Sequence, residues 1–280
     1  MRVEAPNEGR RWRAELALDF RRERGRTVLR QRRYGPLVVQ RALYPEGPDP
    51  CHAVVLHPPG GIAGGDDLRL RLELGPGSHA LVTTPGAGRW YRTTGLEASQ
   101  RVSIVADGAT IEWLPQETIV YDAARARMET EVELRGGGRF LGWEILCLGR
   151  TASGERFERG AIRQRTIIRR DGKLVWSERG ALTGGDPLLA SALGMRGRSV
   201  LATLILAGDA PGPDAIAACR AIAPEEDGAD TGLSCFEGLV LARYLGRSSE
   251  RAKRWLRALW RILRPAGLGR EAEIPRIWNT

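Results

Sequence analysis

The chain has 280 residues, of which 42% are hydrophobic, so it can bury a substantial core. Because architectures built from strands often reach this length as one unit, we expect a single domain over residues 1–280. The formal net charge is +9, and arginine supplies nearly all of the positive charge. No window of the sequence approaches the length of a membrane span, which argues against an integral membrane protein.

The first part of the sequence predicts strands separated by tight turns. Residues 12–20 alternate in hydropathy, a basic turn follows, and the strand pattern resumes at 27–33 and at 37–43. A proline-dense stretch at 44–50 excludes a helix there, and it leads into a short apolar strand at 51–57. Strands and turns therefore account for the whole of this region.

The next stretch places two glycine-rich turns around two further strands. HPPGGIAGGD at 57–66 combines the two residue types that most favour tight reversals. Residues 67–74 then alternate leucine with charged residues, which predicts a strand with one buried and one solvated face. A strand at 80–84 ends in a second glycine turn, which leads into the cluster RWYR at 89–92.

Two hairpins are expected in the middle of the chain, each with an Asp-Gly turn. The first joins 100–106 to 110–114, and the second joins the alternating run 155–170 to 173–178. The sequence between them predicts two more strands, at 128–134 and at 140–147. Most arginines of these strands stand on alternating outward positions, which is typical of a solvated face.

The last third has helical composition at 191–195 and at 213–222, with an apolar strand at 200–206 between them. Its clearest helix spans 249–263, where apolar residues recur along one side and arginines occupy the rest. Ser248 or Ser249 can cap this helix, and Pro265 is expected to end it. The fold class predicted from these elements is mainly β, with a few helices toward the C-terminus.

The tryptophans of this helix admit two interpretations. Its apolar stripe can simply pack on a sheet, as such stripes usually do. Alternatively, Trp255 and Trp260 are flanked by arginines, and both residue types are enriched at binding hot spots. The second interpretation would make this helix part of a partner-binding surface, to which Arg276 and Trp278 could contribute.

The sequence offers little material for an enzymatic site. Three histidines, at 52, 57 and 79, are too few and too scattered for a catalytic metal centre. Four cysteines show no short paired spacing and no signal-like segment is evident at Met1, so we expect reduced thiols and a cytoplasmic location. No GxSxG motif marks a nucleophile. We therefore predict that the chain is not an enzyme.

Four separated motifs carry a family resemblance. They are HPPGGIAGGD, then TTPGAGRWYR at 83–92, then EWLPQE at 112–117, and finally the C-terminal pair LRP at 263–265 and PRIW at 275–278. In this order they resemble the urease accessory proteins of the UreD/UreH family. One position departs from the pattern, since Gly88 and Arg89 stand where threonine or serine followed by lysine is frequent. The role of the Arg89 side chain is therefore left open.

The resemblance implies a metallochaperone scaffold rather than an enzyme. Such a protein would bind apo-urease, recruit UreF and through it the GTPase UreG, and let nickel reach the urease active site. It implies no tightly bound cofactor, transient Ni²⁺, no nucleic-acid or membrane partner, and room for a homodimer within the accessory complex. It also implies packed β-sheets in a β-helix-like arrangement and an internal passage for nickel.

The candidate residues fall into three groups. Carboxylates near the glycine loops and the bend after 114 could line the nickel passage, because oxygen ligands hold Ni²⁺ less firmly than soft ligands do; otherwise they cap turns or face water. These carboxylates are Asp66, Asp67, Glu112, Glu117 and Asp122. The motif loops contribute His57, Pro58, Pro59, Gly60, Gly61, Gly64, Gly65, Thr83, Thr84, Pro85, Gly86 and Arg89. The candidate partner interface consists of Trp255, Trp260, Arg276 and Trp278.

Two other function classes remain open on the residues alone. The charge of +9 and the cation-plus-aromatic cluster at 89–92 fit a nucleic-acid-binding β-protein with a stacking platform. Paired carboxylates on regular strands fit a carbohydrate-active β-solenoid enzyme, with two of them as acid and base. Such an enzyme needs a groove of exposed aromatics, whereas aromatic residues make up 6% of the chain.

Overall fold

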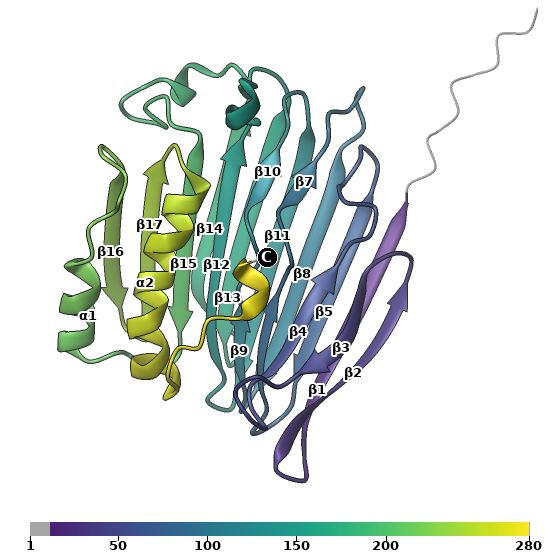
Figure 1. Cartoon of the computed structure of the whole chain (residues 1–280), viewed down its shortest axis with the longest axis vertical. Helices are drawn as coiled ribbons and strands as arrows, with labels where there is room; N and C mark the ends of the chain where they lie inside the picture. Colours follow the sequence, from purple (N-terminus) through teal and green to yellow (C-terminus); the bar gives the residue numbers. More distant parts are fainter. Residues whose placement is uncertain (1–11, 280) are drawn as a thin grey trace, which may run out of the picture.

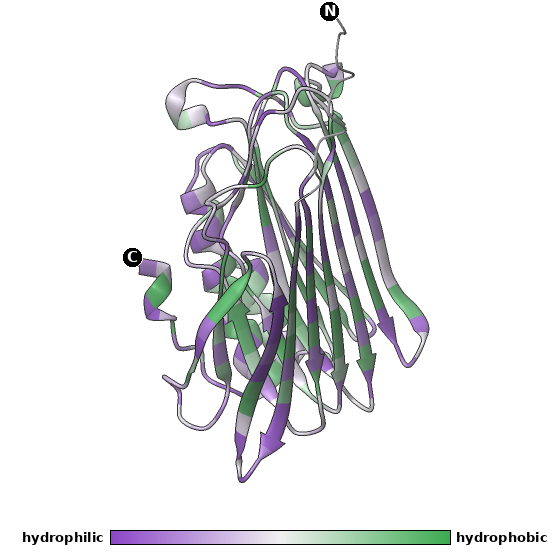
Figure 2. Ribbon diagram, turned by 90° about the vertical axis from the view of Figure 1, so that its right-hand side faces the viewer, coloured by the Kyte–Doolittle hydropathy of each residue, from purple (hydrophilic) through white to green (hydrophobic). Residues whose placement is uncertain are grey.

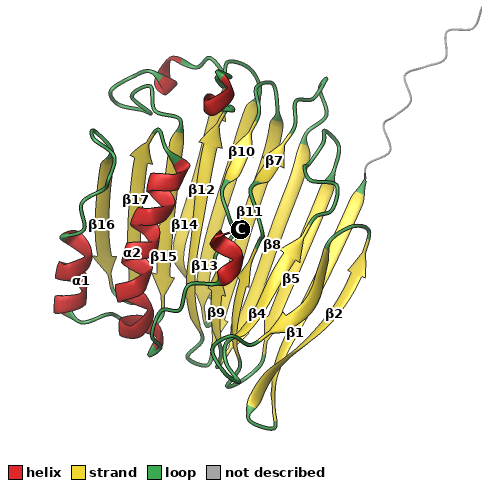
Figure 3. Ribbon diagram, in the orientation of Figure 1, coloured by secondary structure: helices red, strands yellow, loops and turns green. Residues whose placement is uncertain are grey.

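Two β-sheets stack face to face, and helices cover the outer side of one of them (Figure 1, Figure 3). The structure, a computed structural model, describes residues 12–279. One sheet has seven strands, in the order β14-β13-β11-β8-β5-β1-β2, and the other has ten. The main path of the ten-stranded sheet runs β16-β17-β15-β12-β9-β6-β4-β3, with β10 pairing β12 and β7 pairing β10.

The bounds of the elements follow. The seven-stranded sheet contains β1 (Arg13–Glu23), β2 (Arg26–Tyr34), β5 (Asp67–Leu74), β8 (Ala98–Asp107), β11 (Arg125–Arg135), β13 (Ala161–Arg170) and β14 (Lys173–Thr183). The ten-stranded sheet contains β3 (Val38–Leu43), β4 (Cys51–Leu56), β6 (His79–Thr83), β7 (Gly88–Trp90), β9 (Thr110–Trp113), β10 (Thr118–Val120), β12 (Arg139–Leu148), β15 (Val200–Ala207), β16 (Asp230–Phe236) and β17 (Leu239–Gly246). The helices are α1 (Pro213–Arg220) and α2 (Ser249–Leu268), with 3₁₀ turns η1 (Thr151–Ser153), η2 (Pro187–Leu189) and η3 (Arg276–Asn279).

Between β4 and β12 the chain passes back and forth between the sheets. Strands β5, β8 and β11 are parallel neighbours in one sheet, and β6, β9 and β12 are parallel neighbours in the other. The turns that follow β5, β8 and β11 stack through backbone hydrogen bonds. Gly77 N donates to Gly108 O at 2.8 Å, and Gly108 N donates to Arg135 O at 2.9 Å.

This topology corrects the first predicted hairpin. The Asp107-Gly108 turn does not fold β9 back onto β8; it carries the chain from one sheet to the other. Strand β8 instead pairs in parallel with β5 and β11, and β9 pairs in parallel with β6 and β12. Each strand therefore has a hydrogen-bonded neighbour on both edges, which an isolated hairpin would not provide. The second hairpin is confirmed, because β13 and β14 pair antiparallel across Asp171-Gly172.

Alternation in the sequence maps directly onto the two faces of the seven-stranded sheet. Leu68, Leu70, Leu72 and Leu74 of β5 point into the core between the sheets. The charged neighbours face outward, where cross-strand ion pairs such as Arg101–Glu129 at 2.6 Å follow one another. Figure 2 shows this outer face without a covering helix. The expectation that the arginines form a solvated face is confirmed for these strands.

Helix α2 covers β12, β15 and β17 of the ten-stranded sheet (Figure 1). Ser248 caps it by accepting a hydrogen bond from Arg251 N, as predicted. The helix continues through Pro265 to Leu268, so the predicted end is wrong. Proline removes one backbone donor, but the last turn is closed at its C-cap, where Gly269 N donates to Pro265 O at 3.0 Å.

The other predicted helices differ in outcome. Residues 213–220 form α1, as expected, with Pro213 and Asp214 in its first turn. Residues 191–195 form turns rather than a helix, and η2 precedes them. Gly194 lies against the Leu188 carbonyl and Leu193 is fully exposed, so no apolar stripe forms there. The mainly β fold of packed sheets with helices toward the C-terminus is confirmed, and no helix within residues 12–279 is long and apolar enough to cross a membrane.

Candidate functional site

The two glycine-rich motif loops lie side by side at one end of the sheets. Ile62 N donates to Arg89 O at 2.7 Å, and Tyr91 N donates to Ile62 O at 2.8 Å. Gly61 allows this close approach, because a Cβ there would meet the Tyr91 ring at 2.3 Å. The loops 57–66 and 83–92 therefore form one unit. Trp90 within it is buried, so the cluster at 89–92 does not present the stacking platform of a nucleic-acid binder.

A cavity of about 310 Å³ opens between the sheets beside these loops. The motif loops supply one side of it, from His57 to Ile62 and from Thr84 to Arg89. Polar side chains from the facing strands reach into the same space, among them Thr130, Glu144 and Gln164. A smaller cavity of about 90 Å³ shares these three residues and continues toward β14 and β15. A mostly apolar space that carries a few polar side chains thus leads from the motif loops into the interior between the sheets.

Glu144 is the charged group at the junction of the two cavities. Thr130 Oγ1 donates to its carboxylate at 3.0 Å, and Gln164 Nε2 lies 3.5 Å away. Burial raises the pKa of Glu144, and the charge of Glu178 adds to that shift, whereas the Thr130 hydrogen bond opposes it. No ion pair is formed by Glu144 within residues 12–279. This carboxyl can therefore bind a proton or a passing cation.

The sequence patterns did not single out Glu144, because the run 140–147 predicts a strand and matches none of the family motifs. The signal was present, since glutamate is the one charged residue in FLGWEILCL. In a strand that is buried on both faces, a lone charge is costly unless it has a role or a partner. That consideration would have singled out the residue.

The five predicted carboxylates lie outside the lining of this cavity. Asp66 is buried and caps its own turn by accepting from Ala63 N at 2.8 Å. Asp67 faces outward, where it accepts from Ser99 and from Arg69. Asp122 accepts from the backbone and side chain of Arg159. Within residues 12–279 no three His, Cys, Asp or Glu side chains gather to hold a metal ion.

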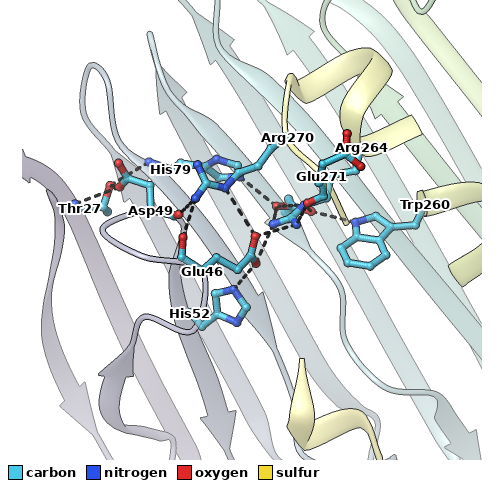
Figure 4. Close-up of polar contacts among 10 residues, drawn as sticks. Thr27, Glu46, Asp49, His52, His79, Trp260, Arg264, Arg270 and Glu271 are labelled. Atoms are coloured by element: carbon cyan, nitrogen blue, oxygen red, sulfur yellow. Dashed lines mark hydrogen bonds and ion pairs between the residues drawn. The ribbon is translucent and has the colours of Figure 1, made fainter. Parts of the chain in front are cut away.

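Glu112 belongs to a buried charge network with Arg264 and Trp260 of α2. Figure 4 shows Arg264 of this network together with Glu46. Glu112 and Arg264 are both 0% exposed, and Arg264 donates to the carboxylate from Nε and Nη2 at 3.0 Å. The same guanidinium donates to both Glu46 oxygens, at 2.8 and 2.9 Å. One arginine therefore pairs with two buried carboxylates that come from distant parts of the chain, and Arg270 adds a second cation, with its Nε 3.5 Å from Glu46 Oε2.

Neighbouring donors complete the network. His79 Nε2 lies 2.9 Å from Glu112, and Trp260 Nε1 donates to the other oxygen of Glu112 at 2.9 Å. His52 Nε2 lies 2.8 Å from Glu46. Burial alone would raise the pKa of Glu112, but the His79 hydrogen bond and the Arg264 charge outweigh it and lower that pKa to about 2.

These contacts join the motifs in pairs. Glu112 of EWLPQE binds Arg264 of LRP, and Trp278 of PRIW donates from Nε1 to Thr83 of TTPGA at 2.8 Å. With the first two motif loops bonded to each other, all four motifs meet in the folded chain. The fold therefore brings together motifs that lie far apart in sequence.

The comparisons with known proteins agree with the motifs. The family described as UreD urease accessory protein matches residues 13–279. The chain belongs to the UreD family. A urease accessory protein UreD from Dechloromonas aromatica (strain RCB) is 56% identical over 283 residues, covering 99% of this chain and 98% of that protein. Relatives with the same name from Azoarcus sp. (strain BH72) and Methylobacillus flagellatus are 52% and 45% identical, over 96% and 97% of this chain and 94% and 95% of theirs.

The predicted partner interface of this UreD-family chain needs a correction. Trp255, Trp260 and Trp278 are 4%, 0% and 7% exposed, so their rings belong to the core between α2 and the sheet. Trp255 Nε1 donates to Ile222 O at 3.0 Å, and Trp278 packs against Trp260 and Trp143. Among the four interface candidates, Arg276 is the exposed one.

The low pKa of Glu112 predicts acid sensitivity of the UreD-family fold. The unfolded carboxyl has its ordinary pKa of 4.5, so it takes up a proton before the folded one does as the pH falls. The stabilisation is therefore fully present above pH 4.5 and is lost between pH 4.5 and about 2. In urea denaturation across this pH range, the free energy of unfolding should fall more steeply with decreasing pH for the wild type than for Glu112→Gln. Equal slopes would show that Glu112 is not the group responsible.

Proposed function

We propose that this chain is a non-catalytic scaffold required for nickel insertion into apo-urease. In this proposal it acts in the cytoplasm, in a complex with UreF and, through UreF, with the GTPase UreG. Nickel is its cargo, held only in passing, and no tightly bound cofactor is needed. Membership of the UreD family supports the assignment to urease maturation.

The observation that supports the nickel role is the space between the sheets, where a few oxygen-bearing side chains stand on a mostly apolar lining. It runs inward from the motif loops, and Glu144 lies at the junction of its two parts. The donors there are oxygens of Glu144, Thr130 and Gln164, which hold Ni²⁺ less firmly than thiolates or imidazoles do. Weak oxygen donors suit a carrier that must release its ion. When the carboxyl gives up its proton to bind the cation, its negative charge offsets one of the two positive charges of Ni²⁺.

Glu144→Gln is expected to reduce urease activation by roughly ten- to a hundredfold, because the loss of one charge-assisted contact costs roughly 1.5–3 kcal/mol and 1.4 kcal/mol is a factor of ten. The amide keeps the size of the side chain and can still accept from Thr130, so the fold should persist. The measurement is the specific activity and nickel content of urease matured in cells that express each variant. Glu73→Gln, an outward-facing change on β5, is the matched control and should leave activation unchanged.

The predicted carboxylates are tested in the same cells. If Asp66→Ala and Glu117→Ala both leave activation unchanged, they take no part in the passage of nickel. If Glu144→Gln also activates urease normally, the space between the sheets is not the route.

The scaffold role is tested separately by co-expression with UreF, UreG and the urease subunits. Affinity capture of this chain should recover urease together with UreF, and UreG only when UreF is present. Recovery of neither urease nor UreF would contradict the proposal.

A further inference from the structure

The outer face of α2 carries a row of arginines. Its opposite face is buried on the sheet, where Leu256, Leu259 and Leu263 are 0% exposed. On the outer face Arg254 is paired, with Glu225 at 2.8 Å and with Glu250. Arg261 is exposed and forms no ion pair within residues 12–279. The helix therefore has positive charge that its own surroundings leave uncompensated.

Arg257 lies between these two arginines and is affected by both. Burial lowers the pKa of Arg257, and the charges of Arg261 and Arg254 lower it further. Its guanidinium lies 6.0 Å from the centre of the Trp278 ring, which supplies a weak attraction to a cation. Like charges are therefore held together on one helix face, at a cost that an anion would relieve.

The C-terminal turn η3 extends this surface. It lies beside α2 on the same side of the ten-stranded sheet (Figure 1), and Arg276 is exposed on it without an ion pair in the part of the chain described. Ile262 and Ile277 are half-buried next to the arginines. We define the α2 basic surface as Arg257, Arg261, Arg276, Ile262 and Ile277.

We propose that the α2 basic surface docks an acidic segment of a protein partner. The proposal rests on the proposed function, which requires such partners. Arg257 and Arg261 are one helical turn apart, so carboxylates of a neighbouring segment can meet both in register. Each guanidinium can bind a carboxylate with two parallel hydrogen bonds, which gives direction as well as attraction.

A protein segment fits this surface better than a nucleic acid does. Glu225, in the loop after α1, and Glu250 already pair with Arg254, so the uncompensated positive charge is confined to a few arginines and does not form the long basic stripe that a phosphate backbone follows. The half-buried isoleucines offer apolar contact that an amphipathic acidic segment uses and a phosphate row does not. The experiment below therefore includes a nucleic acid, and binding to it through this surface would contradict the proposal.

The test compares two charge-reversed variants of equal net charge. Arg261→Glu/Arg276→Glu alters the α2 basic surface, whereas Arg32→Glu/Arg33→Glu alters two exposed arginines of β2 on the edge of the other sheet. Binding of each variant to purified UreF, to apo-urease and to a 20-nucleotide single-stranded DNA is measured at low and at high salt. Thermal melts of both variants check that the fold is intact, and Arg261→Gln/Arg276→Gln provides an intermediate charge.

Arg261→Glu/Arg276→Glu should lose at least tenfold in affinity for UreF or for apo-urease. The affinity of Arg261→Gln/Arg276→Gln should lie between that of this variant and that of the wild type, and Arg32→Glu/Arg33→Glu should bind as the wild type does. The wild-type affinity for the same protein should fall as salt rises. If the wild type binds a partner and the first variant binds it equally well, the docking proposal is overturned while the proposed function stands. A loss confined to DNA also overturns it. If the wild type binds neither protein, the proposed function itself has failed.

Discussion

Replacing Arg264 with methionine is expected to lower the free energy of unfolding by about 3–5 kcal/mol, because removal of one partner leaves buried carboxylates without compensation. Glu112 is 0% exposed, and the Glu46 side chain is 3% exposed. Arg264 is the arginine that bonds to both. Without it Glu46 retains Arg270 at 3.5 Å, whereas Glu112 retains no arginine partner within residues 12–279. Since small domains are stable by only about 5–15 kcal/mol, the variant would unfold readily.

Urea denaturation near neutral pH measures this effect. Arg261→Met is the control on the same helix, since that side chain is exposed and unpaired, and its effect should stay within about 0.5 kcal/mol. If the two variants were equally stable, the network beneath α2 would not hold the C-terminal helix in place.

Trp278→Ala is expected to destabilise the chain by about 3–5 kcal/mol, the usual cost of removing a large buried aromatic side chain. The ring packs at 5.2 Å from Trp143 and 5.6 Å from Trp260, and its Nε1 donates to buried Thr83. Truncation would open a cavity among these rings and leave the Thr83 hydroxyl without its donor. Chemical denaturation gives the magnitude.

The same variant separates the two interpretations of the C-terminal tryptophans. Trp12→Ala, at a side chain that is 55% exposed, is the control and should change stability little. If Trp278→Ala left stability unchanged but abolished partner binding, the interface interpretation would be right after all.

Local sequence patterns predicted where the strands lie more accurately than they predicted which strands pair with each other. The leucine alternation of β5 defined its bounds and its buried face, because side-chain direction in a strand depends on neighbours in sequence. The Asp-Gly turn after β8 carried no such information. A tight turn reverses the chain equally well within one sheet or between two, and the stacking of Gly108 on neighbouring turns decides which occurs.

The site was predictable only in part, for a related reason. Family resemblance pointed to the motif loops, which do border the cavity between the sheets. The partners of the motif side chains lie far away in sequence, however, as Arg264 does from Glu112. The apolar stripe of a helix also predicts which side chains share a face. It does not predict whether another segment of the chain covers the edge of that face. Trp255 lies at that edge, yet it is buried beside Tyr244 and donates from Nε1 to Ile222 O in the segment after α1.

The proposed role of this chain in nickel insertion is tested most directly by the nickel content of urease purified from cells that lack the chain. We expect urease that is assembled but largely free of nickel and inactive, and restoration of both nickel and activity when the wild-type chain is expressed. Fully nickel-loaded, active urease in the absence of the chain would contradict its role as a carrier and scaffold.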